Sequence, residues 1–188
     1  MNNSILETKL SEKTLTYPIL AWSELDSKSA LLLISSPDKI QVLEKFQDHN
    51  LLSLLNKLAV MINSADFVRT SLEGDESMIA FNIPEFTESN LNWENLLTDI
   101  EDAITTGKIG KGLSDKIAAE LQANHHKDIA AAAITTIYGS MLYLLIIKAS
   151  DLGITELMFL GDMLDTERLS AIIAGHLPEH MNLMMLNL

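Results

Sequence analysis

The feature that most constrains this chain is an uncharged run of nineteen residues, Ile129 to Ile147. Asp128 precedes the run as a good helix N-cap, and Lys148 closes it. A run of this length approaches the roughly 20 apolar residues that a membrane span needs. Hydroxyl side chains and a glycine interrupt it, however, and four alanines lower its hydrophobicity. A helix that is apolar all round also suits the centre of a soluble domain. We therefore predict a buried helix over residues 128–150, with a membrane span as the alternative.

Shorter segments of the chain have the patterns of strands and helices. Apolar runs bounded by polar residues predict strands at 28–36, 156–160 and 181–188. Partial alternation on either side of a Glu-Gly-Asp-Glu turn predicts a β-hairpin over 66–83, followed by a polar loop at 84–91. Helical spacing predicts further helices at 37–46, 51–62, 93–106, 115–123 and about 165–175. This alternation indicates an α/β fold, a layered sheet of about five short strands packed by helices.

The domain organisation predicted from the sequence is simple. Residues 1–17 are polar and are expected to form a flexible N-terminal arm, although Leu6, Leu10 and Leu15 leave a short helix or an edge strand open. Residues 18–188 are expected to form a single α/β domain.

The composition of the chain limits its partners. The 188 residues carry a formal net charge of −13, which repels nucleic-acid phosphates and favours basic protein partners. There is no cysteine, so disulfides and thiolate metal sites are excluded. The first sixteen residues contain no apolar core of a signal peptide, and we expect a cytoplasmic protein.

One glycine-rich basic loop could approach a phosphate group. Gly107, Gly110, Lys111 and Gly112 lie in the sequence GKIGKGLS, in which backbone N–H groups, a lysine and the following helix would favour an anion. The order differs from the usual phosphate loop, and the preceding element is a predicted helix rather than a strand. An ordinary connector between two helices is the alternative reading.

Histidines and carboxylates raise the question of a metal site. His125 and His126 are adjacent and diverge by about 100° on a helix, whereas Pro178 separates His176 from His180. The carboxylates that follow the strand at 156–160 could hold Mg²⁺ or could simply cap the next helix. They are Asp162, Asp165 and Glu167. We predict no metal site and no bound cofactor.

The segment 128–187, about a third of the chain, resembles the C-terminal part of the actin-like ATPase and sugar-kinase superfamily. That superfamily includes pilus-assembly and cell-division proteins and pantothenate kinases. The likeness is carried by the helix 128–150, the stretch 153–161 with Gly161, Leu169 with Ile172-Ile173, and 181–186.

The resemblance implies a glycine pair that approaches a nucleotide. Gly161 matches its first glycine, but Asp162 replaces the second, and a carboxylate would repel phosphates. The resemblance therefore implies a shortened, non-catalytic relative.

Two classes of function follow. The first is a non-enzymatic protein-interaction subunit, an adaptor or a secretion-type chaperone component, alone or as a homo- or hetero-oligomer. Its expected contact surfaces are an acidic helix and the methionine-rich C-terminal strand. Their residues are Trp93, Glu94, Asp99, Glu101 and Asp102, and Met181, Met184 and Met185. The alternative is a small nucleotide- or phosphate-binding protein that uses Gly107, Gly110, Lys111, Gly112, Gly161 and Asp162.

Overall fold

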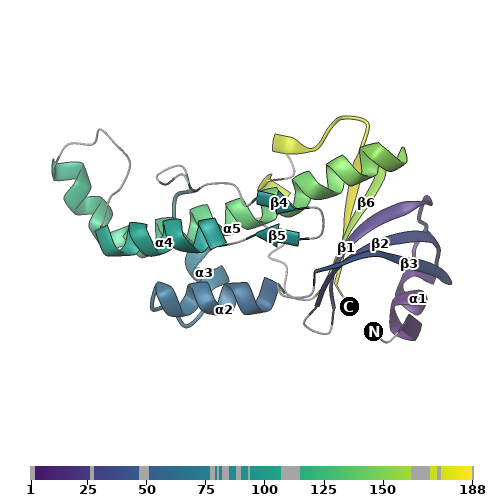
Figure 1. Cartoon of the computed structure of the whole chain (residues 1–188), viewed down its shortest axis with the longest axis horizontal. Helices are drawn as coiled ribbons and strands as arrows, with labels where there is room; N and C mark the ends of the chain where they lie inside the picture. The colour runs from purple at the N-terminus through teal and green to yellow at the C-terminus, as the bar shows by residue number, and fades with distance from the viewer. Residues whose placement is uncertain are drawn as a thin grey trace. The chain divides into compact units, whose positions relative to one another are not determined.

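The computed structural model describes residues 3–25, 28–46, 51–76, 79, 81, 85–87, 90–92, 94–106, 115–161, 170–172 and 175–187. The chain divides into two compact units (Figure 1). Unit 1 comprises Met1–Leu52 and Met141–Leu188, and unit 2 comprises Ser53–Ser140. That residues 18–188 act as one domain stays a prediction.

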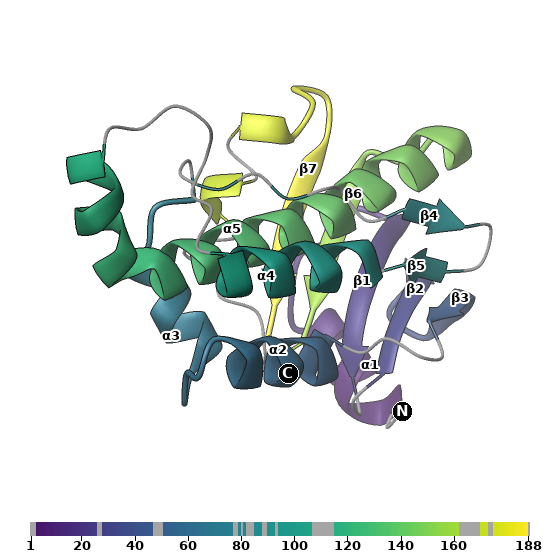
Figure 2. The same ribbon diagram turned by 60° about the vertical axis from the view of Figure 1, so that its left-hand side comes forward.

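Unit 1 is built around a five-stranded mixed sheet in the order β3-β2-β1-β6-β7. Strands β1, β2 and β3 are antiparallel, whereas β6 and β7 run parallel to β1. Their bounds are Ile19–Leu25 (β1), Lys28–Ser36 (β2), Lys39–Phe46 (β3), Glu156–Leu160 (β6) and Asn182–Leu186 (β7). Strands β3 and β7 are the two edges of the sheet (Figure 2). The predicted α/β class, with a sheet of about five short strands packed by helices, is confirmed.

One face of the sheet is covered by helix α1, Asn3–Ser11. Leu6 and Leu10 of α1 are buried, and they join a core cluster with residues of four strands. The strand members of this cluster are Ile19, Ala21, Leu32, Ile34, Met158, Leu160 and Leu186. The segment expected to be a flexible arm thus begins with a helix, because two leucines one turn apart bury their side chains on the sheet.

Two strands of this sheet differ from the sequence prediction. The helix predicted at 37–46 is wrong, because the segment is strand β3 and pairs antiparallel with β2, with Ile40 opposite Ile34. Ser36 Oγ donates to Asp38 Oδ1 at 2.7 Å between the two strands. The sequence predicts no strand at 19–25, yet β1 lies there and is the central strand of the sheet. Tertiary pairing overrides the local helical pattern in this hairpin.

Unit 2 is mainly helical. Its elements are most of α2 (Leu51–Met61), α3 (Phe67–Leu72), β4 (Glu85–Thr87), β5 (Asn90–Asn92), α4 (Glu94–Thr106) and the first part of α5 (Asp115–Leu152). The structure confirms the helices predicted at 51–62 and 93–106. The hairpin predicted at 66–83 is wrong in its first half, where Asp66 accepts the Arg69 N–H at 3.0 Å and caps α3. The polar loop predicted at 84–91 contains β4, which pairs with β5.

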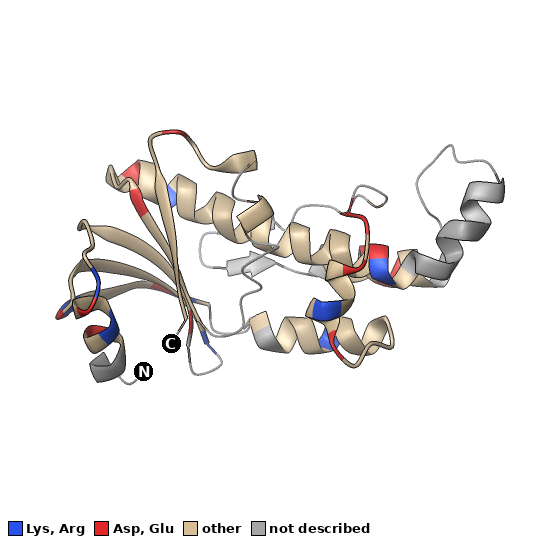
Figure 3. Ribbon diagram, turned by 180° about the vertical axis from the view of Figure 1, so that it is seen from behind, with Lys and Arg blue, Asp and Glu red and all other residues tan. Residues whose placement is uncertain are grey.

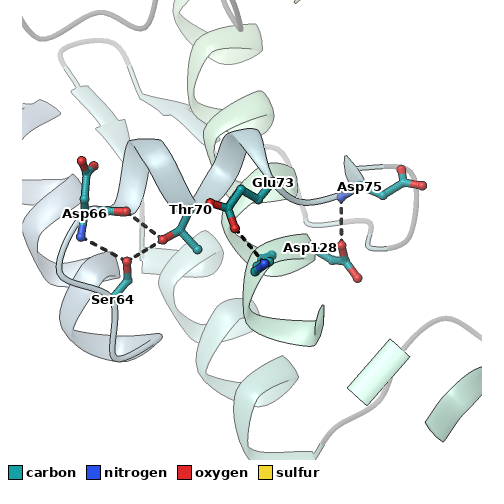
Figure 4. A network of polar contacts seen from close by, with 7 residues as sticks. Ser64, Asp66, Thr70, Glu73, Asp75 and Asp128 are labelled. Carbon is teal, nitrogen blue, oxygen red and sulfur yellow. Dashed lines mark hydrogen bonds and ion pairs between the residues drawn. The ribbon is translucent and has the colours of Figure 1, made fainter. Parts of the chain in front are cut away.

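A polar network holds the end of α3 against α5 within unit 2 (Figure 4). Lys127 Nζ lies 2.7 Å from Glu73 Oε2, and the Asp75 N–H donates to Asp128 Oδ1 at 2.8 Å. Gly74 lies so close to the Lys127 carbonyl that a Cβ at this position would collide with it. Asp128, predicted as an N-cap, instead lies inside α5 and receives a backbone N–H from another segment.

Helix α5 is one continuous helix where the sequence predicts two. Residues 115–152 contain no proline and one glycine, Gly139, so nothing breaks the backbone at 124–127. The stretch His126–Leu152 is long and apolar enough to span a membrane, but 72% of its most apolar window is buried within the protein. The long buried helix is therefore confirmed. Its last part lies over the face of the sheet opposite α1 (Figure 1).

Candidate functional site

Strand β7 is paired on one side only among the residues that the structure describes. The Asn182 N–H donates to Thr155 O at 2.9 Å, and the Gly161 N–H donates to Leu186 O at 3.2 Å. Successive residues of a strand direct their backbone groups to opposite sides. The N–H and C=O groups of Asn182, Met184 and Leu186 therefore point to β6, and those of Leu183 and Met185 point outward. We call this outward side of Asn182–Leu186 the open edge.

The open edge carries no charged side chain (Figure 3). Its register with β6 is regular over all five residues. Met184 packs against the core cluster beside α1, and alternation places Leu183 and Met185 on the opposite face. Met184 and Met185 are half-buried, whereas Met181, also expected at the surface, is buried. Met181, which directly precedes β7, therefore belongs to the core and not to the contact surface.

The other edge of the sheet, β3, is built differently. Its sequence, KIQVLEKF, carries Lys39, Glu44 and Lys45. The pairing with β2 shifts where Leu31 is opposite Glu44 and Leu32 is opposite Val42, which leaves Leu43 as an extra residue. Bulges and lysines are features that prevent an edge strand from pairing with another chain.

The acidic helix predicted at 93–106 is present as α4. Leu96 and Ile100 are buried, whereas Glu101 and Asp102 are exposed and Asp99 is half-buried. Glu101 and Asp102 therefore lie away from the buried stripe, and Asp99 lies at its border. We call these three residues the acidic face. Trp93 lies outside the described residues, and so does the side chain of Glu94.

The residues expected to bind a phosphate are only partly described. Gly107, Gly110, Lys111, Gly112 and Asp162 lie outside the described residues. Gly161 follows β6 with a φ of +146°, a conformation that favours glycine. A Cβ at Gly161 would lie 2.9 Å from the backbone oxygen of Glu24 at the end of β1. The close approach of Gly161 to the neighbouring strand β1 is therefore a sufficient reason for glycine at this position.

A half-buried carboxylate that the sequence did not indicate, that of Glu24, lies beside Gly161. Glu24 Oε1 accepts hydrogen bonds from Trp22 Nε1 and Ser29 Oγ, each at 2.7 Å, and Oε2 accepts the Leu51 N–H at 3.2 Å. Burial raises the pKa of the Glu24 carboxyl above its ordinary value, although these three hydrogen bonds lower it. Glu24 thus joins β1, β2 and the first residue of α2. A lone glutamate near the end of a short apolar segment gives no sequence signal of this role.

The described part of the chain contains no group of three or more histidine, aspartate or glutamate side chains that could hold a metal ion. His176 Nδ1 lies 3.0 Å from the Ile172 carbonyl oxygen, and His180 is exposed in the turn before β7. The carboxylates Asp165 and Glu167 lie outside the described residues.

No protein-family model matches the chain, and no curated protein matches it in sequence. The resemblance of residues 128–187 to the actin-like ATPase and sugar-kinase superfamily therefore remains a hypothesis. The two candidate surfaces, the open edge and the acidic face, rest on the geometry of this chain alone.

Proposed function

We propose that this protein is a non-enzymatic interaction subunit, an adaptor or chaperone-type component of a larger assembly. The observation that carries the proposal is the open edge of β7. An edge strand without a charge, a proline or a bulge is a template on which another strand can pair. Its backbone groups at Leu183 and Met185 supply the hydrogen bonds, and the half-buried methionines supply an adaptable apolar surface.

The charge of the chain supports a second contact. A net charge of −13 favours a partner with a basic surface, and the acidic face of α4 presents Glu101 and Asp102 to solvent. Charges of this kind accelerate association more than they strengthen it, and salt screens them. We propose the cytoplasm as the place of this assembly, in line with the expectation from the N-terminal sequence.

The test is a comparison of what the tagged full chain retains from a lysate of its own organism. Met185→Pro removes one outward N–H of the open edge, and Glu101→Gln with Asp102→Asn neutralises two charges of the acidic face. We expect each change to reduce specific retention of a stoichiometric protein, and the acidic-face change to matter less at high salt. Val42→Thr on β3 is the matched control and should retain the same proteins. Identical retention by all forms would refute the proposal.

A nucleotide- or phosphate-binding protein is the second candidate. The observation that favours it is the order long helix, strand β6, Gly161, helical residues 170–172 and parallel strand β7, which is the order in the superfamily that residues 128–187 resemble. A ligand present at 100 times its Kd stabilises a protein by about 2.7 kcal/mol. A rise in melting temperature with millimolar Mg-ATP would support this candidate, and an unchanged temperature would remove it.

A further inference from the structure

The geometry of the open edge of β7 suits one partner in particular, a second copy of this chain. The inference that follows rests on the proposed function of that edge. We propose that two copies of this chain pair through β7 in antiparallel orientation about a two-fold axis at Met184. The two sheets then form one continuous sheet across the pair. The proposal commits to a second copy as the partner at this edge and leaves the acidic face to a basic partner.

The register follows from the backbone directions. A two-fold axis perpendicular to a sheet keeps each side chain on its own face, so opposite residues must be separated by an even number of positions. With the axis at Met184, Leu183 lies opposite Met185 of the second copy, and Met185 lies opposite Leu183. These are the two strand residues whose N–H and C=O groups point outward. Every backbone group of Asn182–Leu186 that has no strand partner in the described part of the chain therefore gains one.

The same register suits the side chains. Met184 lies opposite itself on the α1 face, and Leu183 lies opposite Met185 on the other face, so apolar residues meet apolar residues on both faces. Moving the axis to Leu183 or Met185 leaves residues of the five-residue strand without a strand partner. No charge lies within β7, so two copies place no like charges opposite each other.

The edge at β3 does not offer this symmetry. It has three charged residues, and the bulge at Leu43 interrupts its pairing. Both Val42 and Leu43 are exposed, at 41% and 38%. Since a bulge twists an edge strand, a second copy of β3 cannot follow it in regular register.

Disulfide trapping tests the register directly, because the chain has no cysteine of its own. Opposite residues that are not hydrogen-bonded to each other have Cα atoms about 4.5 Å apart, within the range of a disulfide. The full-length variant Met184→Cys should therefore form a disulfide-linked dimer. Diagonal neighbours are about 7–8 Å apart, so Leu183→Cys alone and Met185→Cys alone should not cross-link efficiently. An equimolar mixture of these two variants should cross-link.

Val42→Cys on β3 is the control for random collisions. Paired strands hold two thiols at an effective concentration in the millimolar range, so at about 0.1 mM protein Met184→Cys should oxidise at least about tenfold faster than Val42→Cys. Circular dichroism should first establish that each variant is folded. Equal rates for all single-cysteine variants would overturn the proposal, and so would preferential cross-linking of Met185→Cys alone, which requires another axis.

Salt dependence distinguishes a second copy from a basic partner. Two copies with a charge of −13 each repel, so raising the salt concentration should accelerate cross-linking of Met184→Cys. Sedimentation of the cysteine-free wild type should show self-association that strengthens with protein concentration and is absent in Met185→Pro. If the wild type stays monomeric while Met185→Pro still loses a retained protein, the second-copy proposal fails and the proposed function of the open edge stands.

Discussion

The two edges of the five-stranded sheet differ in charge and in the regularity of their pairing. Strand β3 combines Lys39, Glu44 and Lys45 with a bulge at Leu43, whereas β7 has neither a charge nor a break in register. Both strands expose apolar side-chain surface in part. Apolar exposure alone therefore does not mark an interaction surface, because the backbone regularity and the charge of the strand decide whether another strand can pair with it.

The largest expected effect concerns Gly161, which approaches Glu24 of β1 closely and donates its N–H to Leu186 of β7. Gly161→Ala would force a Cβ against the Glu24 carbonyl at a φ of +146° and should reduce the free energy of unfolding by roughly 3 kcal/mol. Urea unfolding measures this change. Gly139→Ala in α5 is the control, because nothing lies within 4 Å of its added Cβ, and it should raise stability by about 1 kcal/mol. A Gly161→Ala protein as stable as wild type would contradict the packing of β6 on β1.

Two proline substitutions compare the side of β7 that faces β6 with the open edge. Met184→Pro removes an N–H that points to β6 and should cost about 2 kcal/mol of unfolding free energy. Met185→Pro removes an N–H that points outward and should cost less than about 1 kcal/mol. Urea unfolding of both variants gives the comparison. The reverse order of stability would mean that the assignment of inward and outward residues is wrong.

The pH dependence of stability tests the half-buried carboxylate of Glu24 in β1. Because the folded pKa of Glu24 is raised, the folded protein binds its proton more tightly than the unfolded chain does. The contribution of Glu24 to stability is therefore fully present below the unfolded pKa and is lost as the pH rises through the folded pKa. Unfolding of wild type and Glu24→Gln across pH 4 to 8 should differ by a component with this sign. A difference that is constant with pH would contradict the raised pKa.

The smallest effect is expected on β3. Val42→Thr keeps a β-branched side chain at a position that is 41% exposed, and it should change the unfolding free energy by less than about 0.5 kcal/mol. It should also leave self-association unchanged in sedimentation. If it weakened association as much as Met185→Pro does, the proposed difference between the two edges would disappear.

The sequence predicts the parts of this fold that carry a strong local pattern. The uncharged run Ile129–Ile147 indicates the long buried helix, and the apolar run at 156–160 indicates β6. The segment 37–46 misleads, because Ser36 and Pro37 form a plausible helix start while the partner strand β2 decides the outcome. The segment after Asp66 is predicted as a strand but forms the short helix α3. One N-cap hydrogen bond and the buried Phe67 suffice for this helix.

The candidate surfaces were predictable only in part. The apolar sequence at 181–188 indicates a strand, but its position at an edge depends on long-range pairing with β6. The burial of Met181 also depends on tertiary packing, so all three methionines look equivalent in the sequence. Glu24 has its role because Trp22, Ser29 and Leu51 converge on it, and no local spacing encodes that convergence.

Amide hydrogen exchange of β7 at two protein concentrations tests the central claim most directly. We expect the N–H groups of Asn182, Met184 and Leu186 to be protected at both concentrations, because they point to β6. Those of Leu183 and Met185 should exchange rapidly in dilute protein and slowly in concentrated protein, since no described strand pairs with the open edge and a second copy would cover it. Equal protection of all five amides at both concentrations would contradict an open edge, and rapid exchange of Leu183 and Met185 at both would contradict pairing with a second copy.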